Sequence, residues 1–522
     1  MADVVKQIRV VYTAYTPPDR DIRITLRRSL SPGPDGAIVA DPRAMAGTAS
    51  ERARCCATGL DKLTERVIDI MKWLLFAAGI SLAGSAAFAQ DQDLETTSDL
   101  DDGAHPLLTD QDQDLETTSD LDDGAYPILL DGTLSGHGDL KEGMATKRGF
   151  LRFDTKLGGW EAWKEQVRKN TGISFSGGVG VLWQNFSNTT PLGDRDAVGG
   201  KLNFNISRDL FNAGTPEALT LAIVIEDRQP VGTDLAPTQG GLLAGSIVPT
   251  ATTYGEFDHL GITQLYIRQN LSENRFQYTI GKLFAPAFIN AYPFFDDNRQ
   301  FFNATFSTSP TIPSPLRGFG AVGVWYPTEG GQYVQGGVFS AKSDDTGFTL
   351  DDVFDTGELF YNLELGWSGL ARTGTPANAR GPMDTNNAHL SFWYKDAQPD
   401  AAVTSQPSAK GVAFNANFMA GQNLMWFVRG GYSQDYINRR NLTAGFGYRP
   451  SERYSDLLGF GVGWVEPSNN ALRDQYTAEA FYRFQVTSNF AVTPDIQYVQ
   501  DPALNPSEND LWVFGLRARV TF

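Results

Sequence analysis

Cysteine and histidine are scarce in this chain of 522 residues, which contains two cysteines and four histidines. The cysteines are adjacent, at Cys55 and Cys56, so their spacing fits neither a disulfide framework nor a metal site. The sequence also lacks a nucleotide-binding loop and a basic patch for nucleic acid. We therefore predict no metal, no cofactor and no nucleic-acid partner.

Long apolar runs are missing from almost the whole chain, which excludes a bundle of membrane helices because each such helix needs roughly 18 apolar residues. One shorter run lies near the N-terminus. Met71 and Lys72 precede the apolar segment 73–88, and a small-residue Ala-x-Ala site ends at Ala89, before Gln90. This order is typical of a secretory signal peptide, so we predict one at 71–89, cleaved between Ala89 and Gln90.

Two further segments lie outside any predicted fold. Residues 1–70 precede the signal peptide, and we interpret them as an upstream extension from a start codon assigned too early; a genuine cytoplasmic or transit extension is the alternative. Residues 91–131 contain 14 acidic residues and no lysine or arginine, and they include an identical repeat that starts at Asp91 and again at Asp112. Two copies are too few for a solenoid, and the spacing does not fit a calcium loop. We predict a disordered acidic linker at 90–140.

The C-terminal segment 511–522 alternates strictly between apolar and mixed residues, which is the side-chain period of a β-strand. The apolar face carries Trp512, Phe514, Leu516, Ala518, Val520 and Phe522. The other face includes Arg517 and Arg519. The same alternation recurs at 476–487, 442–449 and 359–368, with glycine frequent on the second face. Apolar residues facing lipid and polar residues facing a wet lumen are typical of an outer-membrane β-barrel.

We predict an all-β fold, a sixteen-stranded antiparallel transmembrane β-barrel at 172–522 with a short N-terminal helix at 157–171. The predicted strands are 173–187, 200–210, 218–227, 260–271, 275–283, 319–327, 333–342, 359–368, 386–396, 411–420, 424–434, 441–449, 456–466, 475–487, 490–499 and 511–522. Connections after odd strands are mostly long and those after even strands mostly short, as in such barrels. Residues 369–385 are an exception, which indicates either a missed strand or an elaborated turn.

A barrel of this size encloses an aqueous channel, so selectivity depends on whatever narrows it. The loop at 284–318 is rich in aromatic residues and is our candidate constriction. Its candidate residues are Tyr292, Phe294, Phe295, Asp296, Asp297, Arg299 and Arg317. The charged side chains would exchange hydrogen bonds with a solute, and the aromatic rings would offer flat faces to sugar rings. The alternative is that these aromatics only pack the loop onto the barrel wall.

Inward-facing strand positions are the candidates for lining the pore. They are Arg268, Glu364, Trp393, Arg429, Glu479, Arg483, Arg517 and Arg519. This mixture of charges favours neutral, hydroxyl-rich solutes, whereas a general or anion-preferring porin is the alternative because arginine predominates. A hydrolase within the barrel is a weaker alternative that rests on His389 and Ser391, which share one face of a strand.

Three stretches of the chain resemble the carbohydrate-selective porins of the OprB family. They are the C-terminal block 475–522, the segment from Ile280-Gly281-Lys282 to Phe301-Phe302-Asn303, and Phe427–Tyr432. The resemblance implies a sixteen-stranded barrel of the bacterial outer membrane that passes glucose and related small sugars by facilitated diffusion. It also implies that Phe522 is a signal for the outer-membrane assembly machinery. The expected partners are small sugars, outer-membrane lipid and that machinery, with either a monomer or a homotrimer.

Overall fold

The computed structural model describes residues 158–522 apart from 191–192, 216, 273, 349–352, 354–356, 371–381, 400–405 and 451–454. The predicted upstream extension, the signal peptide with its cleavage site at Ala89 and Gln90, and the acidic linker all lie outside the described residues.

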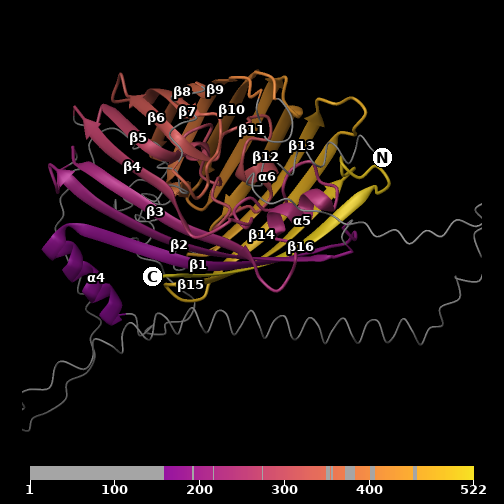
Figure 1. The fold of residues 1–522 in the computed structure, drawn as a ribbon, viewed down its shortest axis with the longest axis horizontal. Coiled ribbons are helices and arrows are strands. Elements are labelled where there is room, and N and C mark those ends of the chain that lie inside the picture. Colours follow the sequence, from indigo (N-terminus) through magenta and orange to yellow (C-terminus); the bar gives the residue numbers. More distant parts are fainter. Residues whose placement is uncertain are drawn as a thin grey trace, which may run out of the picture.

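Sixteen antiparallel strands form one closed barrel in which each strand pairs with its neighbours in sequence and β1 pairs with β16 (Figure 1). The strands are β1 (Ile173–Phe186), β2 (Asp196–Phe211), β3 (Leu219–Pro230), β4 (Gly261–Leu271), β5 (Phe276–Phe284), β6 (Arg317–Trp325), β7 (Gln332–Ser340), β8 (Leu359–Leu370), β9 (Thr385–Lys395), β10 (Ala409–Ala420), β11 (Leu424–Gln434), β12 (Asn438–Tyr448), β13 (Leu457–Pro467), β14 (Gln475–Gln485), β15 (Phe490–Gln500) and β16 (Asp510–Thr521). The predicted fold class and strand number are confirmed.

The barrel closes through backbone hydrogen bonds at the C-terminus. The amide of Gly177 donates to the carbonyl oxygen of Phe522 at 2.9 Å, and the amide of Phe522 donates back to Gly177 at 3.0 Å. Closure leaves no sheet edge exposed, which is necessary in a medium that offers no hydrogen-bond partners to the backbone.

Strand positions agree closely with the prediction. The largest difference is at the start of β2, which begins at Asp196 rather than at 200. The long connection predicted at 369–385 does not contain a missed barrel strand, because β8 pairs directly with β9. A short 3-10 helix, η5 (Pro382–Asp384), immediately precedes β9. The connections that follow even-numbered strands lie at one end of the barrel, which we name the short-turn end.

Alternation along the strands matches the predicted inner and outer faces. On β16, Trp512, Phe514 and Leu516 are 39–46% exposed, whereas the intervening Val513 and Arg517 are at most 1% exposed. Outward aromatic residues include Trp512 at the long-loop end of β16 and Tyr448 at the short-turn end of β12. Their placement fits aromatic girdles at the two membrane surfaces.

Helix α4 (Gly158–Thr171) precedes β1 and confirms the predicted N-terminal helix. The rings of Trp160 and Trp163 stack at 4.9 Å, and Trp160 also makes edge contacts with Phe175 and Phe522. Figure 1 shows α4 beyond the start of β1, at the end of the barrel where the chain ends. No helix in the described part of the chain is long and apolar enough to cross a membrane.

Strands β4 and β5 approach each other closely at Gly281 on β5. Its φ is 143°, and an added Cβ would lie 2.2 Å from the carbonyl oxygen of Leu265 on β4. We expect Gly281→Ala to lower the free energy of unfolding by about 1–3 kcal/mol, because both the backbone conformation and the contact become strained. Denaturant unfolding of the refolded barrel in lipid, followed by tryptophan fluorescence, measures this change.

Gly323→Ala on β6 is the matched control, because an added Cβ would meet only Phe276, at 3.7 Å. We expect this change to stay within about 0.5 kcal/mol. Equal stability of the two variants would contradict the tight approach of β4 and β5.

Candidate functional site

Two long loops fold into the barrel and fill much of its lumen. The β3–β4 loop (231–260) carries helix α5 (Pro237–Leu243), which contacts β1 and β2. The β5–β6 loop (285–316) carries η2 (Ala285–Ala287) and α6 (Ala304–Ser307), and α6 contacts β13 on the opposite wall. Most residues of both loops are buried, so they are fixed parts of the interior.

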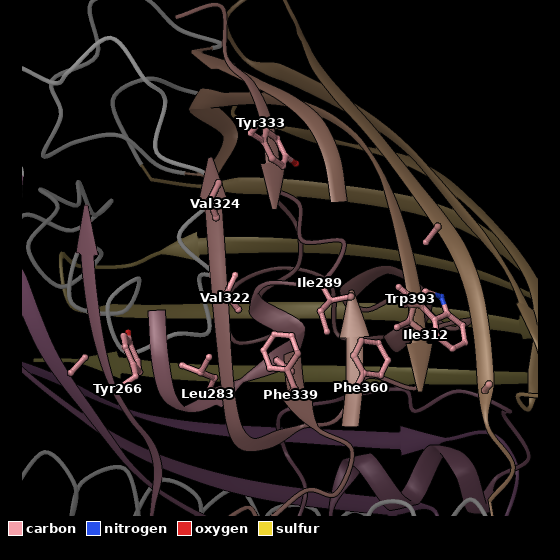
Figure 2. Packing of buried hydrophobic residues seen from close by; sticks show 14 of the residues in the cluster. Tyr266, Leu283, Ile289, Ile312, Val322, Val324, Tyr333, Phe339, Phe360 and Trp393 are labelled. Carbon is pink, nitrogen blue, oxygen red and sulfur yellow. The ribbon is translucent and has the colours of Figure 1, made fainter. Parts of the chain in front are cut away.

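Apolar side chains hold both arms of the β5–β6 loop against the wall. Figure 2 shows Ile289 and Ile312 of the loop close to Phe339, Phe360 and Trp393, which project from β7, β8 and β9. Trp393 stacks on Phe360 with ring centroids 6.0 Å apart and is 4% exposed. The loop and this part of the wall therefore share one hydrophobic cluster.

The aromatic residues predicted at the constriction form a second cluster with the wall. Tyr292, Phe294 and Phe295 are at most 3% exposed, and they pack with Phe301, Phe306, Phe427 and Phe481 among others. Ring centroids of Phe294 and Phe427 are 5.4 Å apart, and those of Phe301 and Phe481 are 5.0 Å apart. The rings thus secure the loop, which is the alternative interpretation given above for these residues.

Two inward carboxylates bind backbone amides of the β5–β6 loop. Glu479 on β14 accepts hydrogen bonds from the amides of Phe302 at 2.6 Å and Asn303 at 3.0 Å. Glu364 on β8 accepts from the amide of Asn290 at 3.1 Å and from the hydroxyl of Tyr333 at 2.8 Å. A loop buried in a lumen needs such partners, because unpaired backbone groups are costly.

Two inward arginines bind the loop's carbonyl oxygens. Arg429 on β11 donates to Asn290 and Thr308, both at 2.8 Å, and to Phe306 at 3.0 Å, and its guanidinium lies 3.9 Å from the ring centre of Tyr292. Arg517 on β16 donates to the carbonyl oxygens of Asp297 and Gln300. Together with the two carboxylates, they attach the loop to strands around the barrel.

The tip of the β5–β6 loop, residues 296–300, is also attached to the β3–β4 loop. The carboxylate of Asp297 accepts a hydrogen bond from the amide of Thr252 at 2.9 Å and another from the amide of Thr253. The neighbouring Asp296 pairs with Arg299 at 2.6 Å. The two loops therefore form one unit, and the predicted acidic pair serves to connect them.

A charged cluster lies on β2, β3 and β6, across the lumen from Glu479. Glu226 accepts from Lys201 at 2.9 Å and from Arg317 at 3.0 Å, and Arg228 lies 3.4 Å away. Arg317 also pairs with Asp345 at 3.0 Å. Lys201 reaches the loop tip at Asn298, 3.3 Å away. This cluster brings closely spaced donors and acceptors to the tip, as recognition of hydroxyl groups requires.

Of this cluster, only Arg317 was predicted from the sequence as a site residue, and Lys201, Glu226 and Arg228 were not. Lys201 and Glu226 occupy inward positions of strands that were recognised, but Arg228 lay beyond the predicted end of the third strand. The sequence did contain a pattern that indicates this cluster, since Glu226 and Arg228 are two residues apart and so share one face of β3. No comparable pattern in the sequence indicates that the β3–β4 loop folds into the lumen.

The eight predicted pore-lining residues occupy different surroundings. Glu364, Arg429, Glu479 and Arg517 bind the loop, and Trp393 lies in the first hydrophobic cluster. Arg268 is buried on β4, where its register partner is Thr279. Arg483 and Arg519 line a hollow beside the loop tip. Their contribution to the conducting path stays a prediction.

His389 and Ser391 do not form a nucleophile and base pair. The Ser391 hydroxyl donates to Glu364 at 2.5 Å, whereas the two ring nitrogens of His389 bond to the side chains of Asn387 and Asn290 at 2.5 and 2.6 Å. Glu364 and His389 both bond to Asn290 of the loop, and Ser391 bonds to Glu364. This arrangement positions the loop rather than activating a nucleophile.

A family model described as carbohydrate-selective porin, OprB family, matches residues 194–522. The chain belongs to the OprB family. It is an outer-membrane porin for carbohydrates, which makes it a transport channel rather than an enzyme. The comparison with curated proteins finds no match for this chain.

Several solved porin structures are similar to this chain. A high-pH structure of OprB from Pseudomonas putida has a TM-score of 0.56 and 16% identity, and the match covers 73% of this chain and 100% of that chain. A low-pH structure of the same protein gives 0.42 and 16%, with 72% and 100% covered. A mutant of the Rh. blastica porin gives 0.42 and 10%, with 67% and 100% covered. At such identities the first match supports the fold alone.

Glu479→Ala tests how the β5–β6 loop is held. The change removes the acceptor of two buried amides, each costing about 1–3 kcal/mol when left unpaired, so the loop should loosen while the wall stays closed. We expect larger and noisier single-channel conductance in planar bilayers. Glu508→Ala, which removes an exposed carboxylate between β15 and β16, is the control. Unchanged conductance in a folded Glu479→Ala barrel would contradict this role.

Proposed function

We propose that this porin passes small neutral sugars such as glucose by passive, facilitated diffusion, and that the β5–β6 loop sets the upper size of the solute. Membership of the carbohydrate-selective family supports the substrate class. The proposal on size rests on the loop, whose backbone is attached to β8, β11, β14 and β16.

The character of the solute follows from the polar groups around the loop tip. Lys201 and Arg317 lie 2.9 and 3.0 Å from Glu226, so both signs of charge supply donors and acceptors there without a uniform field. A hydroxyl group both donates and accepts, so a sugar can replace its water shell there at little cost. Ions of either sign gain less, because each meets a like charge as well.

The outward faces carry exposed Leu, Val, Phe and Trp side chains, which fits contact with outer-membrane lipid. Phe522 directly follows β16, and its backbone bonds to Gly177 on β1. From the resemblance of the C-terminal block to the family, we propose that this residue is read by the outer-membrane assembly machinery.

Liposome swelling with a series of sugars tests the function. We expect the rate to fall steeply from monosaccharides to disaccharides and to be lowest for trisaccharides, because the attached loop limits size. Glucose at high concentration should also lower the ion current through single channels in a planar bilayer. Equal swelling rates for all three sizes, or a current that does not respond to glucose, would contradict the proposal. Heat-denatured protein is the control.

A further inference from the structure

A second polar site lies at the short-turn end, below the tip of the β5–β6 loop. A hollow is bounded there by the loop tip and by β14, β15 and β16. Four arginines line it, namely Arg299, Arg483, Arg517 and Arg519. Among the described residues that line the hollow, none is acidic.

Strand register explains why the arginines converge. Thr493 pairs with Arg517, and Ala491 pairs with Arg519, so these four residues occupy two successive inward rungs of β15 and β16. Arg483 lies near the same end on β14, and Arg299 comes from the loop tip. Alternate positions on a strand face the same side, so the guanidinium groups share one wall of the lumen.

The charges of these arginines are differently compensated. Arg299 pairs with Asp296 at 2.6 Å. Arg483 donates to the carbonyl oxygens of Arg299 and Ser455, and Arg517 donates to those of Asp297 and Gln300. A carbonyl oxygen orients a guanidinium without cancelling its charge. The carboxylates that act on Arg517, those of Asp296, Asp297 and Asp495, do not line the hollow, so its lining presents only positive charged groups.

Arg517 supplies independent evidence for a missing partner. Its side chain is 1% exposed, yet its Nη2 is buried without a hydrogen-bond partner among the described residues. A buried charged donor left unpaired is costly, so such a group marks a position where an acceptor would be favourable. Thr493 and Thr521, which also line the hollow, add hydroxyl groups beside it.

We propose that this hollow binds the carboxylate or phosphate group of an anionic sugar, on the short-turn side of the β5–β6 loop. The inference rests on the proposed sugar-transport function and extends its substrate class from neutral sugars to sugar acids and sugar phosphates. Arginine suits this ligand because its planar fork matches two oxygens of a carboxylate or phosphate. A neutral sugar makes no such pairing with the arginines, so it is not retained in this hollow.

The test compares solutes in single-channel recordings and in liposome swelling. Gluconate, glucose 6-phosphate and inorganic phosphate are added separately on the side of the short turns, with chloride as the reference anion. We expect saturable block of the current by gluconate and glucose 6-phosphate at concentrations where glucose has no comparable effect. Block by the two sugar anions but not by inorganic phosphate shows that the sugar contributes; equal block by all three shows that the oxyanion is sufficient.

Arg519→Gln and Arg483→Gln each remove one guanidinium from the hollow. We expect each to raise the half-blocking concentration of gluconate about tenfold, as loss of one charge-assisted hydrogen bond predicts. Glucose-driven swelling should stay unchanged in Arg519→Gln, whereas Arg483→Gln also loses its bond to the loop carbonyl of Arg299 and is compared by its block alone. Arg275→Gln is the matched control, because Arg275 is exposed at the turn between β4 and β5 and bonds to the carbonyl of Pro327. It removes the same charge at the same end of the barrel.

Three results would overturn the site: no saturable block in the parent protein, the same shift in Arg275→Gln as in the other two variants, or parallel loss of glucose-driven swelling and block. The last result would mean that these arginines only maintain the pore. Failure of the proposed function is distinguishable, since a barrel that passes no glucose but is still blocked by gluconate would keep the site and lose the neutral-sugar proposal.

Discussion

The interior depends on one constraint, which is that a loop placed inside a barrel must find partners for its own backbone. The β5–β6 loop has little regular secondary structure, so its amides and carbonyls need partners from elsewhere. Glu364 and Glu479 accept from its amides, and Arg429 and Arg517 donate to its carbonyls. These four charged residues of the inner wall therefore bind the backbone of the loop rather than a solute.

This arrangement separates two tasks that inward charges could perform. The residues that hold the loop are nearly all inaccessible, whereas polar groups at its tip lie beside two spaces of different character. Toward β2, β3 and β6 the charges are mixed around Glu226, and toward β14, β15 and β16 arginine predominates. The lumen therefore contains a region of mixed charge and an arginine-rich region, and strand register sets the position of both.

Much of the fold was predictable because a lipid environment imposes a strict rule on each strand. Trp512, Phe514 and Leu516 face lipid, and a shift of one residue would place Arg517 there, so the sequence carries an unambiguous period. The candidate loop was also predictable, since a run that includes Tyr292, Phe294 and Phe295 is too apolar for a solvent-exposed connection.

The details of the site were not predictable to the same extent. Glu226 and Lys201 meet across two strands, and Asp297 meets Thr252 across two loops, so both contacts depend on tertiary placement. Periodicity indicates which way a side chain points but not what it meets. For this reason, Arg429 and Arg517 were recognised as inward without any sign that they bind the same loop.

The contact between α4 and Phe522 bears on how an unfinished barrel differs from a finished one. The ring of the final residue meets Trp160, which comes from the first described element of the chain, and its backbone pairs with Gly177. Neither contact can form before β16 has met β1. The surroundings of the Phe522 ring therefore differ between an open sheet and a closed barrel, since closure places this side chain against α4 and the first strand.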